Sequence, residues 1–292
     1  MNRRRFLCLA APVALVALDG GRIARATTPS TPPAPSTPGT GVVSPTIPLP
    51  VDPATPVIRL TSEGGFVPRG WDFSAPPMLL ITAGGDVYRS GAMTAEFPGP
   101  LLLPIDHQRL TPAGVQKVMR AADLAGLLAP PPDYNDVDFQ ITDVATTVLT
   151  ITTGAGAVSH AAYALGISPD GSGKEVTPAR QKLKAFVDVL ATLDSLVGAD
   201  LSAPTPFEPT EYRMVAFPVN IADYAGNDPQ PVVKDWPAGT GVTLSTADQC
   251  TRVAADQVAA LFADASQLTF FAEAGTTYQV FTRGVLPGDA TC

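Results

Sequence analysis

The sequence predicts an α+β protein whose antiparallel sheets are each covered by helices on one face, with two such units in tandem. Strand pairs separated by glycine turns indicate antiparallel hairpins, and each of the first two pairs precedes a helical pattern that begins at Thr-Pro. A proline-rich joint at 201–209 then divides the chain, and its 292 residues allow two domains of about 150 residues. We therefore expect a first domain over 57–200 and a second, smaller domain over 208–292.

The first hairpin is expected over 78–90, where a glycine pair supplies the positive φ of a tight turn. The helix after it begins with Thr111 as N-cap and Pro112 in the first turn, where a missing N–H costs little. Gly126 ends this helix. Its apolar stripe has helical spacing and consists of Val115, Val118, Met119, Ala122 and Ala125.

A second hairpin is expected over 146–165, because a β-branched run, TTVLTITT, precedes a glycine-rich turn. The next helix repeats the Thr-Pro start at Thr177 and ends at Gly198. Its buried face is predicted to contain Leu183, Phe186, Val187, Leu190 and Val197.

The second domain is expected to contain a strand at 212–217, a helix and a hairpin over 268–282. Val258, Leu261, Phe262 and Ala265 have the spacing of the buried face of that helix. The order resembles that of the first domain, so a diverged repeat is one interpretation.

Residues 1–26 have the pattern of an export signal. Arg3, Arg4 and Arg5 precede an apolar run over 6–18, and Ala24 and Ala26 supply the small side chains of a cleavage site. The run is shorter than the roughly 20 residues that span a bilayer. The paired arginines favour twin-arginine export, although general secretion accepts similar starts. We expect a secreted or cell-envelope protein with no transmembrane segment in its mature chain.

Residues 27–56 differ in composition from the rest of the chain. Ten of them are Pro, and most others are Thr, Ser, Gly or Ala. This segment has too little apolar surface to offset the entropy cost of ordering, so we expect a disordered, polyproline-like tether. It is either a stalk that holds a domain away from a surface or a spacer without further role.

Cleavage after Ala26 changes both charge and cysteine count. It leaves 14 basic and 26 acidic residues, a net charge of −12, so no nucleic-acid partner is expected. It also leaves two of the three cysteines, Cys250 and Cys292. An even number in an oxidising compartment predicts one disulfide between them, with two free thiols or a bond between chains as the alternatives.

Short motifs are spread along most of 58–292: Gly85–Arg89, Phe97–Pro100, Arg109–Gly114, the Ala-Gly-Leu-Leu of 125–128, Thr142-Asp143, Tyr163–Gly166, Cys250, Tyr278, Leu286-Pro287 and Cys292. Together they resemble a family of exported bacterial proteins of unknown function. Near the end, this chain has Arg-Gly-Val-Leu-Pro at 283–287 where that family suggests a fuller Arg-Pro-Leu-Leu-Pro run. The resemblance implies an architecture and no activity.

The two histidines are the first candidates for a general base. His107 follows Asp106, and His160 follows Ser159. Adjacent residues of an extended strand point to opposite faces, so neither pair is predicted to form an aligned dyad. Two separate imidazoles also make a zinc site improbable. We therefore assign no catalytic, cofactor-binding or metal-binding residue.

Three further features have a functional and a structural interpretation. The segment 166–174 resembles a phosphate loop, but Glu175 stands where a Ser or Thr would bind magnesium, which favours a surface loop. The tryptophans Trp71 (beside Asp72) and Trp236 (beside Asp235) are either sugar platforms or core residues. An acidic stretch suits calcium or a solvated loop, and it contains Asp133, Asn135, Asp136, Asp138 and Asp143.

These observations favour an exported, non-enzymatic binding or scaffolding module whose partner is an envelope protein or polymer. A carboxylate-dependent hydrolase of envelope carbohydrate or peptide is the first alternative, favoured if Asp136 or Asp143 faces a tryptophan across a pocket. A secreted protein inhibitor is the second alternative, since a rigid acidic sheet suits partner recognition.

Mass spectrometry of the exported protein is expected to show an N-terminus at Thr27, because the small residues before it satisfy signal peptidase. An exported chain that starts at Met1 would contradict the signal-peptide interpretation.

Overall fold

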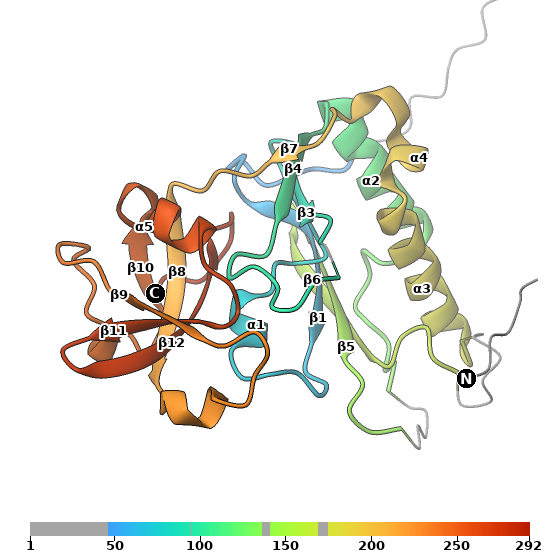
Figure 1. Ribbon diagram of the computed structural model, residues 1–292. Coiled ribbons are helices and arrows are strands. Elements are labelled where there is room, and N and C mark those ends of the chain that lie inside the picture. The colour runs from blue at the N-terminus through green and yellow to red at the C-terminus, as the bar shows by residue number, and fades with distance from the viewer. Residues whose placement is uncertain (1–45, 94, 136–140, 169–174) are drawn as a thin grey trace, which may run out of the picture. The chain divides into compact units, whose positions relative to one another are not determined.

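Two β-sheets and five α-helices form the described part of a computed structural model, residues 46–93, 95–135, 141–168 and 175–292 (Figure 1). The fold is of the mixed α+β class. The expected signal peptide, with Arg3, Arg4, Arg5, Ala24 and Ala26, lies outside these residues, as does the expected tether up to residue 45.

The first sheet has seven strands in the order β6-β5-β1-β2-β3-β4-β7, and every neighbouring pair is antiparallel. Both hairpins expected from the sequence are present, as β2–β3 and β5–β6. The strands are β1 (Pro56–Glu63), β2 (Leu79–Thr82), β3 (Asp86–Ser90), β4 (Ile105–Arg109), β5 (Thr146–Thr153), β6 (Gly156–Tyr163) and β7 (Thr205–Pro206).

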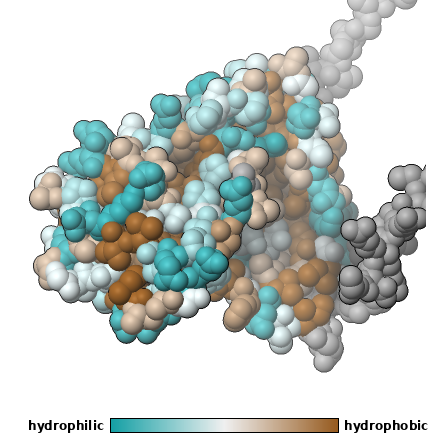
Figure 2. Space-filling model, in the orientation of Figure 1, coloured by the Kyte–Doolittle hydropathy of each residue, from teal (hydrophilic) through white to brown (hydrophobic). Residues whose placement is uncertain are grey.

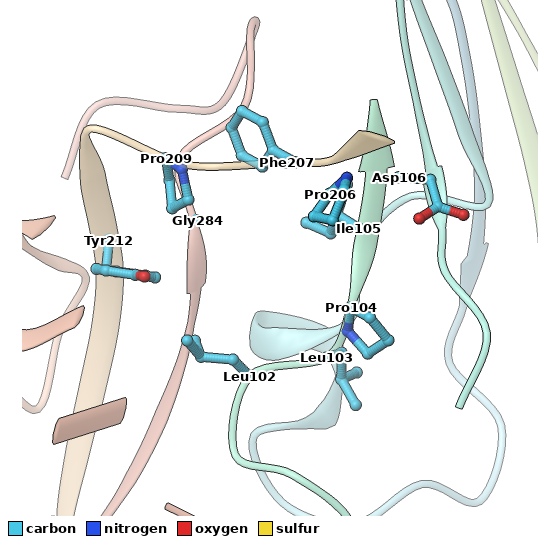
Figure 3. A pocket seen from close by; sticks show the side chains of 10 residues that line it. All are labelled: Leu102, Leu103, Pro104, Ile105, Asp106, Pro206, Phe207, Pro209, Tyr212 and Gly284. Carbon is cyan, nitrogen blue, oxygen red and sulfur yellow. The ribbon is translucent and has the colours of Figure 1, made fainter. Parts of the chain in front are cut away.

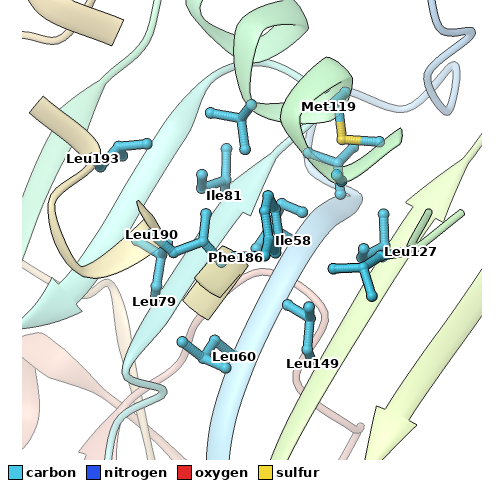
Figure 4. Packing of buried hydrophobic residues seen from close by; sticks show 14 of the residues in the cluster. Ile58, Leu60, Leu79, Ile81, Met119, Leu127, Leu149, Phe186, Leu190 and Leu193 are labelled. Carbon is cyan, nitrogen blue, oxygen red and sulfur yellow. The ribbon is translucent and has the colours of Figure 1, made fainter. Parts of the chain in front are cut away.

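Helices α2 (Pro112–Leu124) and α3 (Pro178–Ala191) begin where the Thr-Pro pairs predict. The Thr111 hydroxyl accepts a hydrogen bond from the Gly114 N–H at 3.1 Å, and Thr177 caps α3 in the same way. Figure 4 shows Met119 of α2 and Phe186 of α3 packed with Ile58 of β1, in a continuous apolar core.

The helix expected to continue to Gly198 is interrupted at Thr192. Its backbone has φ −113° and ψ 47°, outside the helical region, and its hydroxyl donates to the Asp188 carbonyl at 3.2 Å. The short helix α4 (Leu193–Val197) follows this break, and its Leu193 and Val197 are buried in the first core.

Part of the expected tether belongs to the folded unit. Ile47 and Leu49 pack against the first core, and the Ile47 N–H donates to the Gln116 side chain at 3.0 Å. The Pro48 carbonyl accepts from the Gly154 N–H at 2.8 Å. Ile47 and Leu49 thus bury apolar surface against the first core, so 46–56 is part of the folded unit and not a disordered tether.

The second sheet has five strands in the order β10-β8-β12-β11-β9. The pair β9–β11 is parallel, which differs from the expected fully antiparallel sheet. α5 (Ala255–Ala263) packs Phe262 against Phe271 of β11 in a second core. The strands are β8 (Glu211–Pro218), β9 (Val232–Asp235), β10 (Thr251–Ala254), β11 (Thr269–Glu273) and β12 (Thr276–Gly284).

The two sheets are not separate tandem domains, because residues 46–292 belong to one compact unit. β7, from the expected joint, pairs with β4 of the first sheet. The short helix α1 (Trp71–Ser74) contacts β8 and β12 of the second sheet. Leu101, far earlier in the chain, is buried in the second core. Segments from each half of the chain thus pack against the sheet of the other half, and they bury surface that two isolated domains would expose.

A buried charge cluster joins the sheets. Asp289 receives two hydrogen bonds from Arg283 of β12, at 2.6 and 2.7 Å, and its side chain is 1% exposed. Arg59 of β1 lies 3.5 Å from the same carboxylate, and Arg213 of β8 lies 3.8 Å from it. One carboxylate is therefore shared by cations of both sheets.

Cys250 and Cys292 lie at disulfide-bonding distance, with their Cα atoms 4.8 Å apart. Among the residues that the structure describes, none of the helices has the length and apolar character needed to cross a membrane.

We expect Asp289→Asn to lower the free energy of unfolding by about 3–5 kcal/mol, because it leaves the Arg283 charge buried without its partner. Burial alone would raise the pKa of Asp289, but the hydrogen bond and charge of Arg283 hold that pKa below its usual value. The carboxylate therefore stabilises the fold above about pH 4, and this contribution is lost as the pH falls through the depressed pKa. Urea unfolding at several pH values measures both effects.

Asp188→Asn is the matched control, since it removes the exposed pair between Asp188 and Lys184 of α3. Its expected cost is below about 0.5 kcal/mol. Equal losses in the two variants would contradict a special role for the Asp289 cluster.

Candidate functional site

A cavity of about 620 Å³ lies between α1, the segment 97–103 and the second sheet, and we call it the Trp71 pocket. Its volume is within the range of about 300–1,000 Å³ that is usual for small-molecule sites. Figure 1 shows α1 between the two sheets. The apolar wall includes Trp71, Phe97, Leu101, Leu103, Tyr224 and Phe281.

The position of Trp71 depends on the glycine before it. Gly70 has φ +76°, and a Cβ at this position would overlap the Phe281 ring of β12. Only a glycine lets the chain approach that ring and turn at once into α1. The Ser74 hydroxyl then donates to the Gly70 carbonyl at 3.1 Å, which holds the turn together.

Besides Tyr224, four polar side chains line the pocket: Arg69, Ser74, Gln267 and Gln279. Arg69 places its guanidinium Cζ 3.6 Å from the centroid of the Phe217 ring, a cation–π contact. Gln267 and Gln279 supply amide groups. Among the described residues that line the pocket there is no carboxylate, imidazole, thiol or amine. Tyr224 and Ser74 add hydroxyl groups to this lining, so its polar groups can orient a ligand through hydrogen bonds.

The two tryptophans have different surroundings. Trp236 is 7% exposed, donates from Nε1 to the Val242 carbonyl at 2.9 Å and packs on Phe271, so it is a core residue. Trp71 lines the pocket, as a platform residue would. The neighbouring carboxylates, Asp235 and Asp72, are exposed.

A second cavity, of about 220 Å³, lies between the segment before β4 and strands β8 and β12 (Figure 3). Leu103 lines both cavities. Asp106 and Tyr212 are the ionisable residues of this wall among those described, and burial raises the pKa of Tyr212. A single carboxylate does not provide the acid and base pair of a glycosidase.

His160 is a structural residue of the first core. It is 1% exposed; its Nε2 donates to the Leu127 carbonyl at 2.8 Å, and its Nδ1 lies 2.8 Å from the Tyr134 hydroxyl. Because the carbonyl can only accept, Nε2 carries a hydrogen in this contact. Ser159 points to the opposite face and contacts Thr150, so the two residues do not form a dyad, as expected.

Arg180 extends the same network beneath α3. It is fully buried, and its Nε donates to the Glu175 carboxylate at 2.6 Å. Its terminal nitrogens donate to the carbonyls of Tyr134, Tyr163 and Ala164 at 3.0–3.1 Å. Arg180 and His160 together fasten the segment around Tyr134 to the sheet, which is a structural role.

His107 has a partner that adjacency in the sequence does not reveal. Its Nε2 lies 2.9 Å from Asp86 Oδ1, and Arg109 donates to the same oxygen at 2.8 Å. The register of β3 and β4 sets Tyr88 opposite His107 and Arg89 opposite Asp106. Asp86 is thus the diagonal neighbour on the same face as His107. A prediction of the pairing register of β3 and β4 would have found the pair.

The two loop candidates are only partly described. Residues 169–174 of the phosphate-loop-like segment lie outside the described residues, and the Gly166 N–H donates to Glu175. Asp136 and Asp138 of the acidic stretch are also outside. Asp133 accepts from the Asn135 N–H at 2.8 Å. In the part of the chain that is described, no group of three His, Cys, Asp or Glu side chains is arranged to hold a metal ion.

Apolar surface is also present away from the pocket. Val232 and Val233 of the edge strand β9 are 51% and 47% exposed. Figure 2 shows apolar residues over the second sheet, surrounded by hydrophilic ones.

Comparisons with known proteins give no guide to the site: no family model, no curated protein and no solved structure matches this chain.

Single-tryptophan variants test the two environments. Acrylamide is expected to quench Trp71 emission, left alone in Trp236→Phe, several-fold more efficiently than Trp236 emission in Trp71→Phe, because Trp236 is enclosed by the core. Equal quenching constants in two folded variants would show that Trp71 does not line an open pocket.

Proposed function

We propose that this chain is an exported, non-enzymatic binding module that holds a small, mainly apolar ligand in the Trp71 pocket. The observation that carries the proposal is the pocket itself: about 620 Å³, with aromatic side chains from four separate segments in its wall. Its polar groups are an arginine, two glutamines and a serine, which suit orientation of a bound molecule.

Export is part of the same proposal. The basic start, the apolar run and the Ala24–Ala26 site support it, as does the Cys250–Cys292 pair, since disulfides persist mainly outside the reducing cytosol. We also propose that the chain belongs to the family of exported bacterial proteins that its sequence motifs resemble.

The pocket geometry favours binding over the hydrolase alternative. That alternative needs two carboxylates near the bound substrate, and the described pocket wall contains none. The backbone carbonyl of Asp143 accepts from the Phe66 N–H at 3.3 Å, yet Asp143 is not among the residues that line the pocket.

The test uses the full chain and the fluorescent probe 1-anilinonaphthalene-8-sulfonate. Phe97, which is 65% exposed at the pocket border, is expected to cover a bound ring. Phe97→Ala should therefore weaken probe binding by about tenfold, because the probe then buries less apolar surface against the protein.

Phe66→Ala is the matched control, because Phe66 is 90% exposed and does not line the pocket. It should leave probe affinity unchanged. The proposal fails if the native protein does not bind the probe, or if both variants bind it as the native protein does.

A further inference from the structure

Arg69 differs from the other arginines of the described chain in its lack of a polar partner. Two of them, Arg89 and Arg120, donate to backbone carbonyls. The remaining arginines each lie against a carboxylate: Arg59, Arg109, Arg180, Arg213, Arg252 and Arg283. Within the described residues, Arg69 has only its contact with the Phe217 ring.

That contact leaves the hydrogen-bond donors of Arg69 available. The guanidinium is planar, and its N–H groups lie in the plane and point outward from its edge. Stacking on Phe217 occupies one face of the plane and restrains its orientation, while the edge can still donate two parallel hydrogen bonds. This geometry matches the two oxygens of a carboxylate.

The charges of the residues that line the pocket also favour a carboxylate ligand. The whole chain has a net charge of −8, yet the described residues that line the Trp71 pocket include one cation and no acid. Arg69 is therefore the charge that an anion meets in the described lining, beside an apolar cavity.

We infer that the Trp71 pocket takes a single-chain amphiphilic carboxylate, with its head group on Arg69 and its apolar tail against Trp71 and Phe281. This inference rests on the proposed function and adds the chemical class of the ligand.

The experiment compares three probes that share a dodecyl chain: dodecanoate, dodecanol and dodecyltrimethylammonium, each below the concentration at which it forms micelles. Titration calorimetry with the full chain should give dodecanoate the highest affinity. Arg69→Gln should lower dodecanoate affinity by about tenfold and dodecanol affinity by less than twofold. Arg69→Lys should restore only part of the loss, because an ammonium group cannot form the paired hydrogen bonds.

Lys182→Gln is the matched control. It removes the same charge from an exposed position on α3, outside the pocket lining, and should leave dodecanoate affinity unchanged. A comparable loss in this variant would mean that net charge, and not Arg69, attracts the anion, which overturns the inference.

The other outcomes separate the inference from the proposed function. If dodecanol binds as tightly as dodecanoate, or Arg69→Gln weakens both equally, the inference fails while the binding proposal stands. If phosphatidylglycerol vesicles bind but monomeric dodecanoate does not, a membrane surface replaces the single-chain ligand and the inference fails. If no dodecyl probe and no anilinonaphthalene sulfonate binds, the proposed function itself fails.

Discussion

The buried carboxylate of Asp289 is the constraint on which the arrangement of the two sheets depends. Its side chain is 1% exposed, so its charge is stable only because Arg283 binds it directly and Arg59 and Arg213 lie near it. Arg213 also lies under the Phe73 ring of α1, with its guanidinium Cζ 4.2 Å from the ring centroid. The same helix begins with Trp71. The cluster that joins the sheets therefore also supports one wall of the pocket.

The arginines of this protein divide into two groups with different consequences. Arg180 and Arg283 are buried and bound to carboxylates. Arg180 also donates to the distant Tyr134 carbonyl, and the carboxylate bound by Arg283 lies near Arg59 of the other sheet. Such pairs restrain the packing around them, because a buried charge that loses its partner is costly. Arg69 is exposed, rests on an aromatic ring and has no carboxylate of its own within the described chain. Its charge is available to a ligand, which is the basis of the inferred carboxylate site.

Sequence patterns predicted some residues of the candidate site and missed the contacts that place them. The composition identified two tryptophans as possible platforms, but it could not separate Trp71 from Trp236, because one lies beside a cavity and the other against α5 and β11. The partner of His107 was also missed. Asp86 is separated from it by the long segment 91–104, and only the pairing register of β3 and β4 brings the two side chains to one face. Gly70 is detectable in the sequence as a small residue directly before a helix. Its contact with the Phe281 ring is not detectable, because Phe281 lies far along the chain.

The sequence by itself determined the local elements: two hairpins, two helices that begin at Thr-Pro pairs and the strand, helix and hairpin of 211–284. These follow from caps, turns and periodicity, which act over a few residues. Only the tertiary structure decided the sheet order, the parallel β9–β11 pair, the burial of Ile47 and Leu49, and the cavity between α1 and β12. Each of these depends on apolar area and charges contributed by segments far apart in sequence, whose free energy of contact no local pattern encodes.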